Sequence, residues 1–145
     1  MYFVDRQKIG RILEYLEKQL ELFEGQESWN GKLMEHSVER IIQTSIDSVL
    51  DAGNAMIDGF IMRDPGSYED IVDILLDEKV ITEPISLQFK KALPLRKMLV
   101  QDFIEVDHTV LLTVFKENIE AFKQFPELIR NYLLNELGPV SAFKN

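Results

Sequence analysis

The sequence predicts an all-α fold, an up-and-down helical bundle of about five to six helices. Residues 34–63 contain no proline, and apolar residues recur among them every three or four positions, the spacing that lines one side of an α-helix. Segments before and after this stretch repeat the spacing, and residues typical of helix starts separate them. We therefore expect one domain over residues 1–145, built around a central helix, with residues 138–145 as a loose tail.

The first half of the chain is expected to hold two long helices. Asp5 is a plausible N-cap for an amphipathic first helix, and Trp29 in the following connection is expected to cover the core. The helix over 34–63 is apolar on more than half of its circumference, which predicts a place in the middle of the bundle. A turn at 64–66, with sequence Asp-Pro-Gly, then leads to Ser67 as the cap of a short helix.

The second half is expected to hold the remaining helices. One should run from about residue 83 to 106, and Pro94 should kink or divide it because proline lacks the backbone N–H that a helix needs. Asp107 is expected to cap the next helix and Pro126 to interrupt it. A last helical segment should then end at Gly138.

Composition limits the chemistry that the chain can perform. Cysteine is absent, which removes disulfides, thiolate nucleophiles and cysteine-based zinc sites. The 25 acidic and 16 basic residues give a net charge of −9, which repels phosphate backbones on average, so any nucleic-acid site must be local. The N-terminus is charged and no apolar run approaches the ~20 residues that cross a bilayer. We expect a cytoplasmic protein that does not enter the membrane.

A polar stripe follows the central helix at the same three-to-four spacing. Its members are Arg40, Gln43, Asp47, Asp51, Asn54 and Asp58. Stacked carboxylates can hold a metal inside a bundle, but di-metal bundles use glutamates with Glu-x-x-His motifs, which the stripe lacks. The favoured interpretation is a solvated or capping stripe without a metal. His36 and His108 are interpreted as surface or capping residues.

The chain has one basic patch. It comprises Lys90, Lys91, Arg96 and Lys97, in a stretch that contains no acidic residue. Two interpretations are about equally supported: the cations bind phosphate, or they neutralise acids on neighbouring helices. Arg96 stands out because a guanidinium can hold a phosphate at two points, whereas lysine offers a point charge.

Three short motifs, in this order and spacing, resemble the HepT-like proteins, a branch of the HEPN superfamily. They are LDAGNAMI at 50–57, PGSYED at 65–70 and LRKMLV at 95–100. The resemblance covers most of the chain and implies an all-α bundle that forms a homodimer. It further implies a metal-independent, cofactor-free endoribonuclease that acts on RNA as the toxin of a toxin-antitoxin pair, with a nucleotidyltransferase antitoxin of the MNT type.

The active signature of that family is an arginine, a spacer of four to six residues, a histidine, any residue and a tyrosine. On this sequence the arginine is Arg96, while Gln101 and Phe103 occupy the histidine and tyrosine positions. The resemblance implies that Arg96 steadies the phosphate and that the histidine, across a dimer interface, moves protons at the RNA 2′-hydroxyl. Glutamine cannot act as a general acid or base near neutral pH, and Phe103 lacks the hydroxyl that the antitoxin adenylates in such pairs.

The first interpretation is therefore a HepT-like ribonuclease toxin that is weakly active or catalytically degenerate. Its candidate catalytic residues are Arg96, Gln101, Asp102 and Phe103, and its candidate RNA-binding or phosphate-binding residues are Lys90, Lys91, Arg96 and Lys97. On an ideal helix Phe103 shares a face with Arg96, as a dimer seam would require, and Gln101 points away.

Two alternatives remain open. The first is a non-enzymatic dimeric module for protein interaction. The second is a nucleotide-binding sensor that uses the basic patch together with Asp51 and Asn54 as a polar lining of the site.

Overall fold

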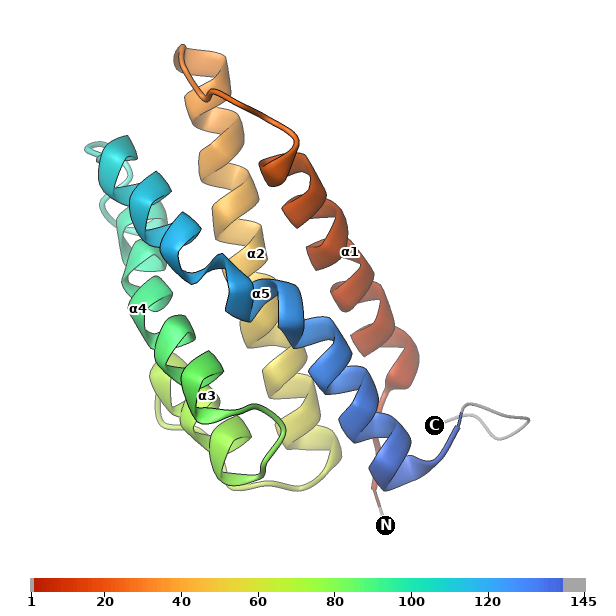
Figure 1. Cartoon of the computed structure of the whole chain (residues 1–145). Helices are drawn as coiled ribbons and strands as arrows, with labels where there is room; N and C mark the ends of the chain where they lie inside the picture. Colours follow the sequence, from red (N-terminus) through yellow and green to blue (C-terminus); the bar gives the residue numbers. More distant parts are fainter. Residues whose placement is uncertain (1, 140–145) are drawn as a thin grey trace.

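The computed structural model describes residues 2–139, which form five α-helices and contain no strand. The helices are α1 (Arg6–Glu24), α2 (Lys32–Gly59), α3 (Tyr68–Asp77), α4 (Glu83–Val100) and α5 (His108–Leu137). The four long helices alternate in direction along the bundle, and the short α3 packs beside α2 and α4 (Figure 1). The predicted all-α, up-and-down architecture is confirmed.

Three helix starts are fixed by the side chains that the sequence predicts. The carboxylates of Asp5 and Asp107 accept hydrogen bonds from the backbone N–H of Lys8 (3.0 Å) and Val110 (3.1 Å). The hydroxyl of Ser67 accepts one from Asp70 N–H at 3.0 Å. Each bond satisfies an N–H that has no partner within its own helix.

The core is aliphatic between α1 and α2 and aromatic between α4 and α5. Phe89 of α4 meets Phe122 and Phe125 of α5 edge to face, with ring centroids 5.1 and 5.5 Å apart. Trp29 is 8% exposed and stacks on Phe23 at 5.9 Å, so its predicted role as a cover for the core is confirmed.

Gly53 allows α3 to approach α2 closely. A Cβ atom at this position would lie only 2.9 Å from Cγ2 of Ile71 and 3.1 Å from Cδ1 of Leu75. Such contacts would force the two helices apart or shift Ile71. The glycine therefore brings the start of α3, with Tyr68, next to the polar stripe of α2.

The central helix ends earlier than the sequence predicts. It spans Lys32–Gly59 rather than 34–63, and Ile61, expected in its second apolar row, is 68% exposed with a φ of 56°. The N–H groups of Ile61 and Met62 donate to the carbonyls of Asp58 (3.3 Å) and Ile57 (2.9 Å). These two bonds close the helix in a Schellman-type turn, which needs a left-handed residue at the position of Ile61.

Neither proline divides its helix, so the expected interruption at Pro126 is wrong and, of the two outcomes expected at Pro94, the division is excluded. Pro94 lies inside the continuous α4, and Pro126 lies inside the continuous α5, so no separate last segment exists between it and Gly138. Each proline removes one hydrogen bond, but the surrounding apolar residues are buried on both sides of it. Packing of that face outweighs the missing bond.

The helix expected over 83–106 stops at Val100 because little holds it beyond that point. Residues 101–105 are exposed, and Gln101 N–H makes the last helical bond to the carbonyl of Lys97 at 2.8 Å. Within residues 2–139 no helix is long and apolar enough to cross a bilayer. Of the expected loose tail, residues 140–145 lie outside the described part of the chain.

Replacing Ile61 by glycine is expected to stabilise the fold by about 0.5–1 kcal/mol. A left-handed conformation costs an L-residue about 1–2 kcal/mol, and the extra chain entropy that glycine loses offsets part of the gain. Chemical denaturation of wild type, Ile61→Gly and the control Ile61→Ala measures this effect. A gain as large in the alanine variant would show that backbone strain is not its source.

Candidate functional site

Arg96 of α4 is held by Asp47 of α2, a residue 49 positions earlier in the chain. Its Nε donates to Oδ1 of Asp47 at 2.8 Å, and both side chains are partly buried. This hydrogen bond raises the pKa of Arg96 above its ordinary value, so the guanidinium stays charged. Asp47 belongs to the polar stripe, so part of that stripe faces the arginine of the signature.

Tyr68, the first residue of α3, fixes the other side of the guanidinium. The Cζ atom of Arg96 lies 4.6 Å from the centroid of the Tyr68 ring, a cation–π distance. Within residues 2–139, neither terminal nitrogen of Arg96 donates a hydrogen bond to the protein. The side chain is thus oriented by two partners while two donor groups remain available.

A cleft of about 450 Å³ opens beside Arg96, between α3 and the C-terminal half of α4. It is lined by Ser67, Tyr68, Glu69, Lys90, Leu93, Pro94, Arg96, Lys97 and Gln101. Gln101 therefore lines the same cleft as Arg96 and does not point away from it, contrary to the sequence-based expectation. Gln101 keeps helical backbone angles and lies one turn after Lys97, on the face of α4 that lines the cleft, and the Arg96 side chain lines the same cleft from an adjacent position.

Two of the other three cations of the basic patch form ion pairs with acidic side chains. Nζ of Lys90 pairs with Oδ1 of Asp73 at 2.5 Å and lies 4.0 Å from Glu69, and the Asp73 hydrogen bond raises the pKa of Lys90. Lys97 lies 3.5 Å from Asp102. Lys91 is exposed and makes no ion pair within the described residues. The patch therefore attracts phosphate less than its sequence suggests.

The remaining candidate catalytic residues lie in the turn after α4. Asp102 and Phe103 are exposed and do not line the cleft. Phe103 is 62% exposed and its neighbour Ile104 is 86% exposed. This turn thus exposes apolar side chains beside the cleft. Phe103 lies outside α4 and does not share a helical face with Arg96.

The polar stripe of α2 divides into parts with different surroundings. Asp47 binds Arg96, whereas Asp51 and Asn54 line a second hollow of about 460 Å³. Arg40 and Asp58 are exposed. No group of three or more histidine, aspartate or glutamate side chains within residues 2–139 could hold a metal ion.

The two histidines lie away from the Arg96 cleft. His108 joins the start of α5 to α2, because its Nε2 lies 2.7 Å from Oε2 of Glu39 and its Nδ1 3.7 Å from Oε2 of Glu35. His36 is exposed on α2. Both are surface or helix-start residues, as expected.

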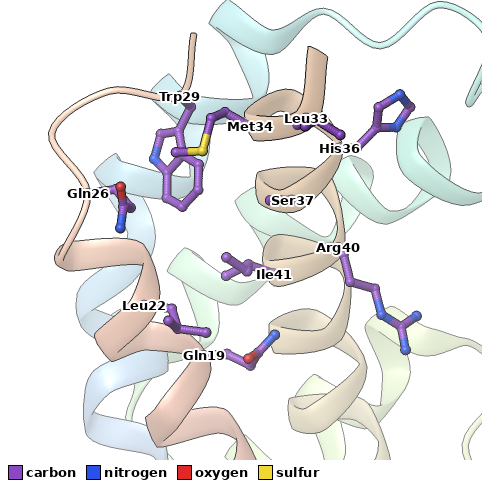
Figure 2. A pocket seen from close by; sticks show the side chains of 10 residues that line it. All are labelled: Gln19, Leu22, Gln26, Trp29, Leu33, Met34, His36, Ser37, Arg40 and Ile41. Carbon is purple, nitrogen blue, oxygen red and sulfur yellow. The ribbon is translucent and has the colours of Figure 1, made fainter. Parts of the chain in front are cut away.

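A larger hollow of about 740 Å³ lies beside the C-terminal half of α1, the following connection and the N-terminal half of α2. Figure 2 shows Trp29, Met34, Leu22 and Ile41 around it, and His36 and Arg40 are among its polar lining residues. Within the described residues, however, His36 makes no hydrogen bond to another side chain that would orient it. The Arg96 cleft is therefore the better candidate for chemistry.

Tyr68 is the main contributor that the sequence analysis missed. It was visible only as the aromatic residue after the Ser67 cap. The available signal for a functional role of Tyr68 was its position between the Ser67 cap and two acidic residues, where an aromatic side chain is not expected to be buried. Its pairing with Arg96 could not be deduced without the packing of α3 on α4.

Together, the five-helix bundle and the cleft at the end of α4 define a class of all-helical proteins with an arginine-lined cleft. A family model described as ribonuclease HepT-like matches residues 7–129. The chain belongs to this ribonuclease HepT-like family.

Individual relatives agree with this assignment. The chain is 51% identical over 144 residues to the protein named "Putative RNase YutE" of Bacillus subtilis (strain 168), covering 99% of this chain and 100% of the relative. It is 27% identical over 97 residues to the mRNA nuclease HepT of Shewanella oneidensis, covering 67% and 73% of the two chains.

Solved structures show the same fold. The structure of YutE, described as a cytosolic protein, superposes with a TM-score of 0.95 over 99% of this chain and 100% of that one. The Shewanella oneidensis HEPN toxin, in a complex with its MNT antitoxin, superposes with a TM-score of 0.71 at 23% identity, over 86% and 95% of the two chains.

Asp51→Asn is expected to raise the melting temperature near pH 7. Burial, and then the charge of Asp47, raise the pKa of Asp51 above its ordinary 3.8, against smaller opposing effects of Lys8 and Arg96. The folded state is therefore penalised when Asp51 ionises. This loss in the free energy of unfolding is absent below pH 3.8, the ordinary pKa of aspartate. It develops as the pH rises through the raised pKa of Asp51 and is complete at neutral pH.

Thermal unfolding at pH 7 and pH 4 tests this sign. The advantage of Asp51→Asn should shrink at pH 4, and Asp58→Asn controls for the loss of one negative charge, since Asp51 and Asp58 are both exposed residues of α2. An advantage that stays constant with pH would contradict the assignment.

Proposed function

We propose that this protein is an RNA-binding member of the ribonuclease HepT-like family with weak cleavage activity. Arg96 holds a phosphate of the RNA backbone, and Gln101 positions the ribose hydroxyl next to it. The main support is the geometry of Arg96, which Asp47 and Tyr68 orient while both terminal nitrogens remain free beside the cleft. A guanidinium presented in this way suits the paired oxygens of a phosphate.

Cleavage is weak because the cleft lacks the histidine of the family signature. Gln101 occupies the position of the signature histidine and lines the cleft. Its amide can donate and accept hydrogen bonds, but it does not titrate. A missing general acid or base typically costs ~10²- to 10⁴-fold in rate. Asp102, in the adjacent turn, is exposed and paired with Lys97, so it is a poor substitute.

The same proposal covers the cellular role. Shewanella oneidensis HepT is named an mRNA nuclease, and its HEPN toxin is found in a complex with an MNT antitoxin. We infer that this chain is likewise a cytoplasmic toxin-type protein with a nucleotidyltransferase partner. Phe103 offers no hydroxyl for adenylation, so the partner cannot silence it at that position.

A second candidate function is that of a dimeric interaction module without catalysis. The observation that favours it is the apolar tip, formed by Val100, Phe103, Ile104 and Val110, which are 37%, 62%, 86% and 44% exposed. Such a patch on a chain of net charge −9 marks an interface. We propose that a second copy of the chain covers the tip and that the homodimer places the two Arg96 clefts near its seam.

Introducing the missing histidine is expected to increase RNA cleavage. Gln101→His would place a group with a pKa of about 6.5 in the cleft, and cleavage in EDTA should rise by ~10²-fold or more. Gel analysis of total cellular RNA incubated with wild type and variant measures the change. Asp102→His, one residue away and outside the cleft lining, is the matched control.

The same assay includes Gln101→His combined with Arg96→Ala, prepared identically. Cleavage should return to background in the double variant, because no phosphate is held beside the new histidine. Activity that survives without Arg96 would point to a contaminating nuclease or to a different site, and the proposal would fail.

The homodimer is expected to dissociate when charge enters the tip. Phe103→Asp combined with Ile104→Asp should convert dimer to monomer in light scattering coupled to size exclusion, because buried unpaired carboxylates are costly. Leu87→Asp, at a side chain on α4 that is 53% exposed and lies outside the tip, should leave the dimer intact. A double variant that remains dimeric would exclude the tip as the interface.

A further inference from the structure

The second hollow lies next to the Arg96 cleft and shares Tyr68 with it. Its polar wall is Asp51 and Asn54 of α2, and its apolar floor is Leu50 and Ile71, which are buried. Pro65 closes the far side. Both hollows are lined by Ser67 and Tyr68, so a ligand that bridges them passes the start of α3.

Tyr68 is suited to stack a planar ligand. It is 52% exposed, and Arg96 covers one face of its ring at 4.6 Å. Arg96 does not line the second hollow, whereas Tyr68 does, so a flat ring that enters this hollow meets Tyr68. Stacking between an aromatic side chain and a nucleobase is the usual way in which proteins hold single-stranded RNA.

The turn of residues 64–66, which lines part of the second hollow, is held by hydrogen bonds. Arg63 donates to both carboxylate oxygens of Asp70, at 2.8 and 2.9 Å, and Gly66 N–H donates to the same carboxylate at 2.9 Å. Ser67 caps α3 through Asp70 N–H. These bonds are exposed and contribute little to stability, but they hold the turn of residues 64–66 in one conformation, so the hollow is ready for a ligand.

Asp51 and Asn54 supply polar groups without partners. They lie one helical turn apart on the same face of α2, and neither side chain makes a hydrogen bond within the described residues. An ionised carboxylate accepts hydrogen bonds and donates none. It therefore favours a ligand edge that carries two adjacent N–H donors.

Guanine is the base whose pairing edge offers this pattern. Its N1–H and N2–H groups lie side by side and match the two oxygens of a carboxylate. Adenine and cytosine present one amino group beside an acceptor, and uracil presents one N–H between two acceptors. The amide of Asn54 can donate to the neighbouring O6 of the same base.

We propose that the hollow formed by Asp51, Asn54 and Tyr68 binds a guanine base of single-stranded RNA, with the adjoining phosphate on Arg96. The inference rests on the proposed binding of RNA and adds to it a base preference. It identifies Asp51 as the residue that determines specificity and Tyr68 as the stacking platform.

Fluorescence anisotropy with labelled uridine decamers that carry one central guanosine or one central adenosine tests the preference. Wild type should bind the guanosine strand about tenfold more tightly, in the range that one bidentate base contact provides. Asp51→Asn should remove the difference, whereas Asp58→Asn, an exposed position outside the lining, should retain it. Arg96→Ala should weaken binding of both strands.

The outcomes separate the two proposals. Binding that depends on Arg96 but does not distinguish the strands, or a guanosine preference that survives Asp51→Asn, would overturn the guanine site and leave the RNA-binding proposal standing. An absence of binding to either strand at low salt would overturn both.

Discussion

The hydrogen bond between Asp47 and Arg96 is the interaction on which the rest of the site depends. It joins the middle of α2 to the last turns of α4, 49 residues apart, and it orients a guanidinium that would otherwise sample many rotamers. The Tyr68 ring completes the orientation from α3. Three helices thus meet at one side chain, which lines the cleft, and Tyr68 lines both this cleft and the second hollow.

This arrangement explains how an acidic protein can present a phosphate site. The chain carries a net charge of −9, and most cations near the cleft are paired with acids. The proposed RNA binding would therefore rely on a few oriented donors rather than on a broad positive surface, and its dependence on salt should be shallow. In this proposal, glutamine and phenylalanine at the histidine and tyrosine positions of the signature leave the orientation of Arg96 intact but supply no acid–base group.

Local features were predictable from the sequence and non-local ones were not. The caps at Asp5, Ser67 and Asp107 depend on neighbouring residues only, and the sequence predicted all three. The effects of Pro94 and Pro126 depend on packing against other helices, and the expected breaks are absent. The polar stripe and the arginine were both recognised, but their pairing through Asp47 requires the helix register, which no sequence pattern reveals.

The most direct test of the account is the RNA affinity of Asp47→Ala, measured beside Asp58→Ala on the same helix. Simple electrostatics predicts that removing either carboxylate strengthens binding to a polyanion. The account predicts the opposite for Asp47→Ala alone, because the released Arg96 side chain loses its orientation and must be ordered by the ligand. Binding by Asp47→Ala that equals or exceeds that of Asp58→Ala would contradict it.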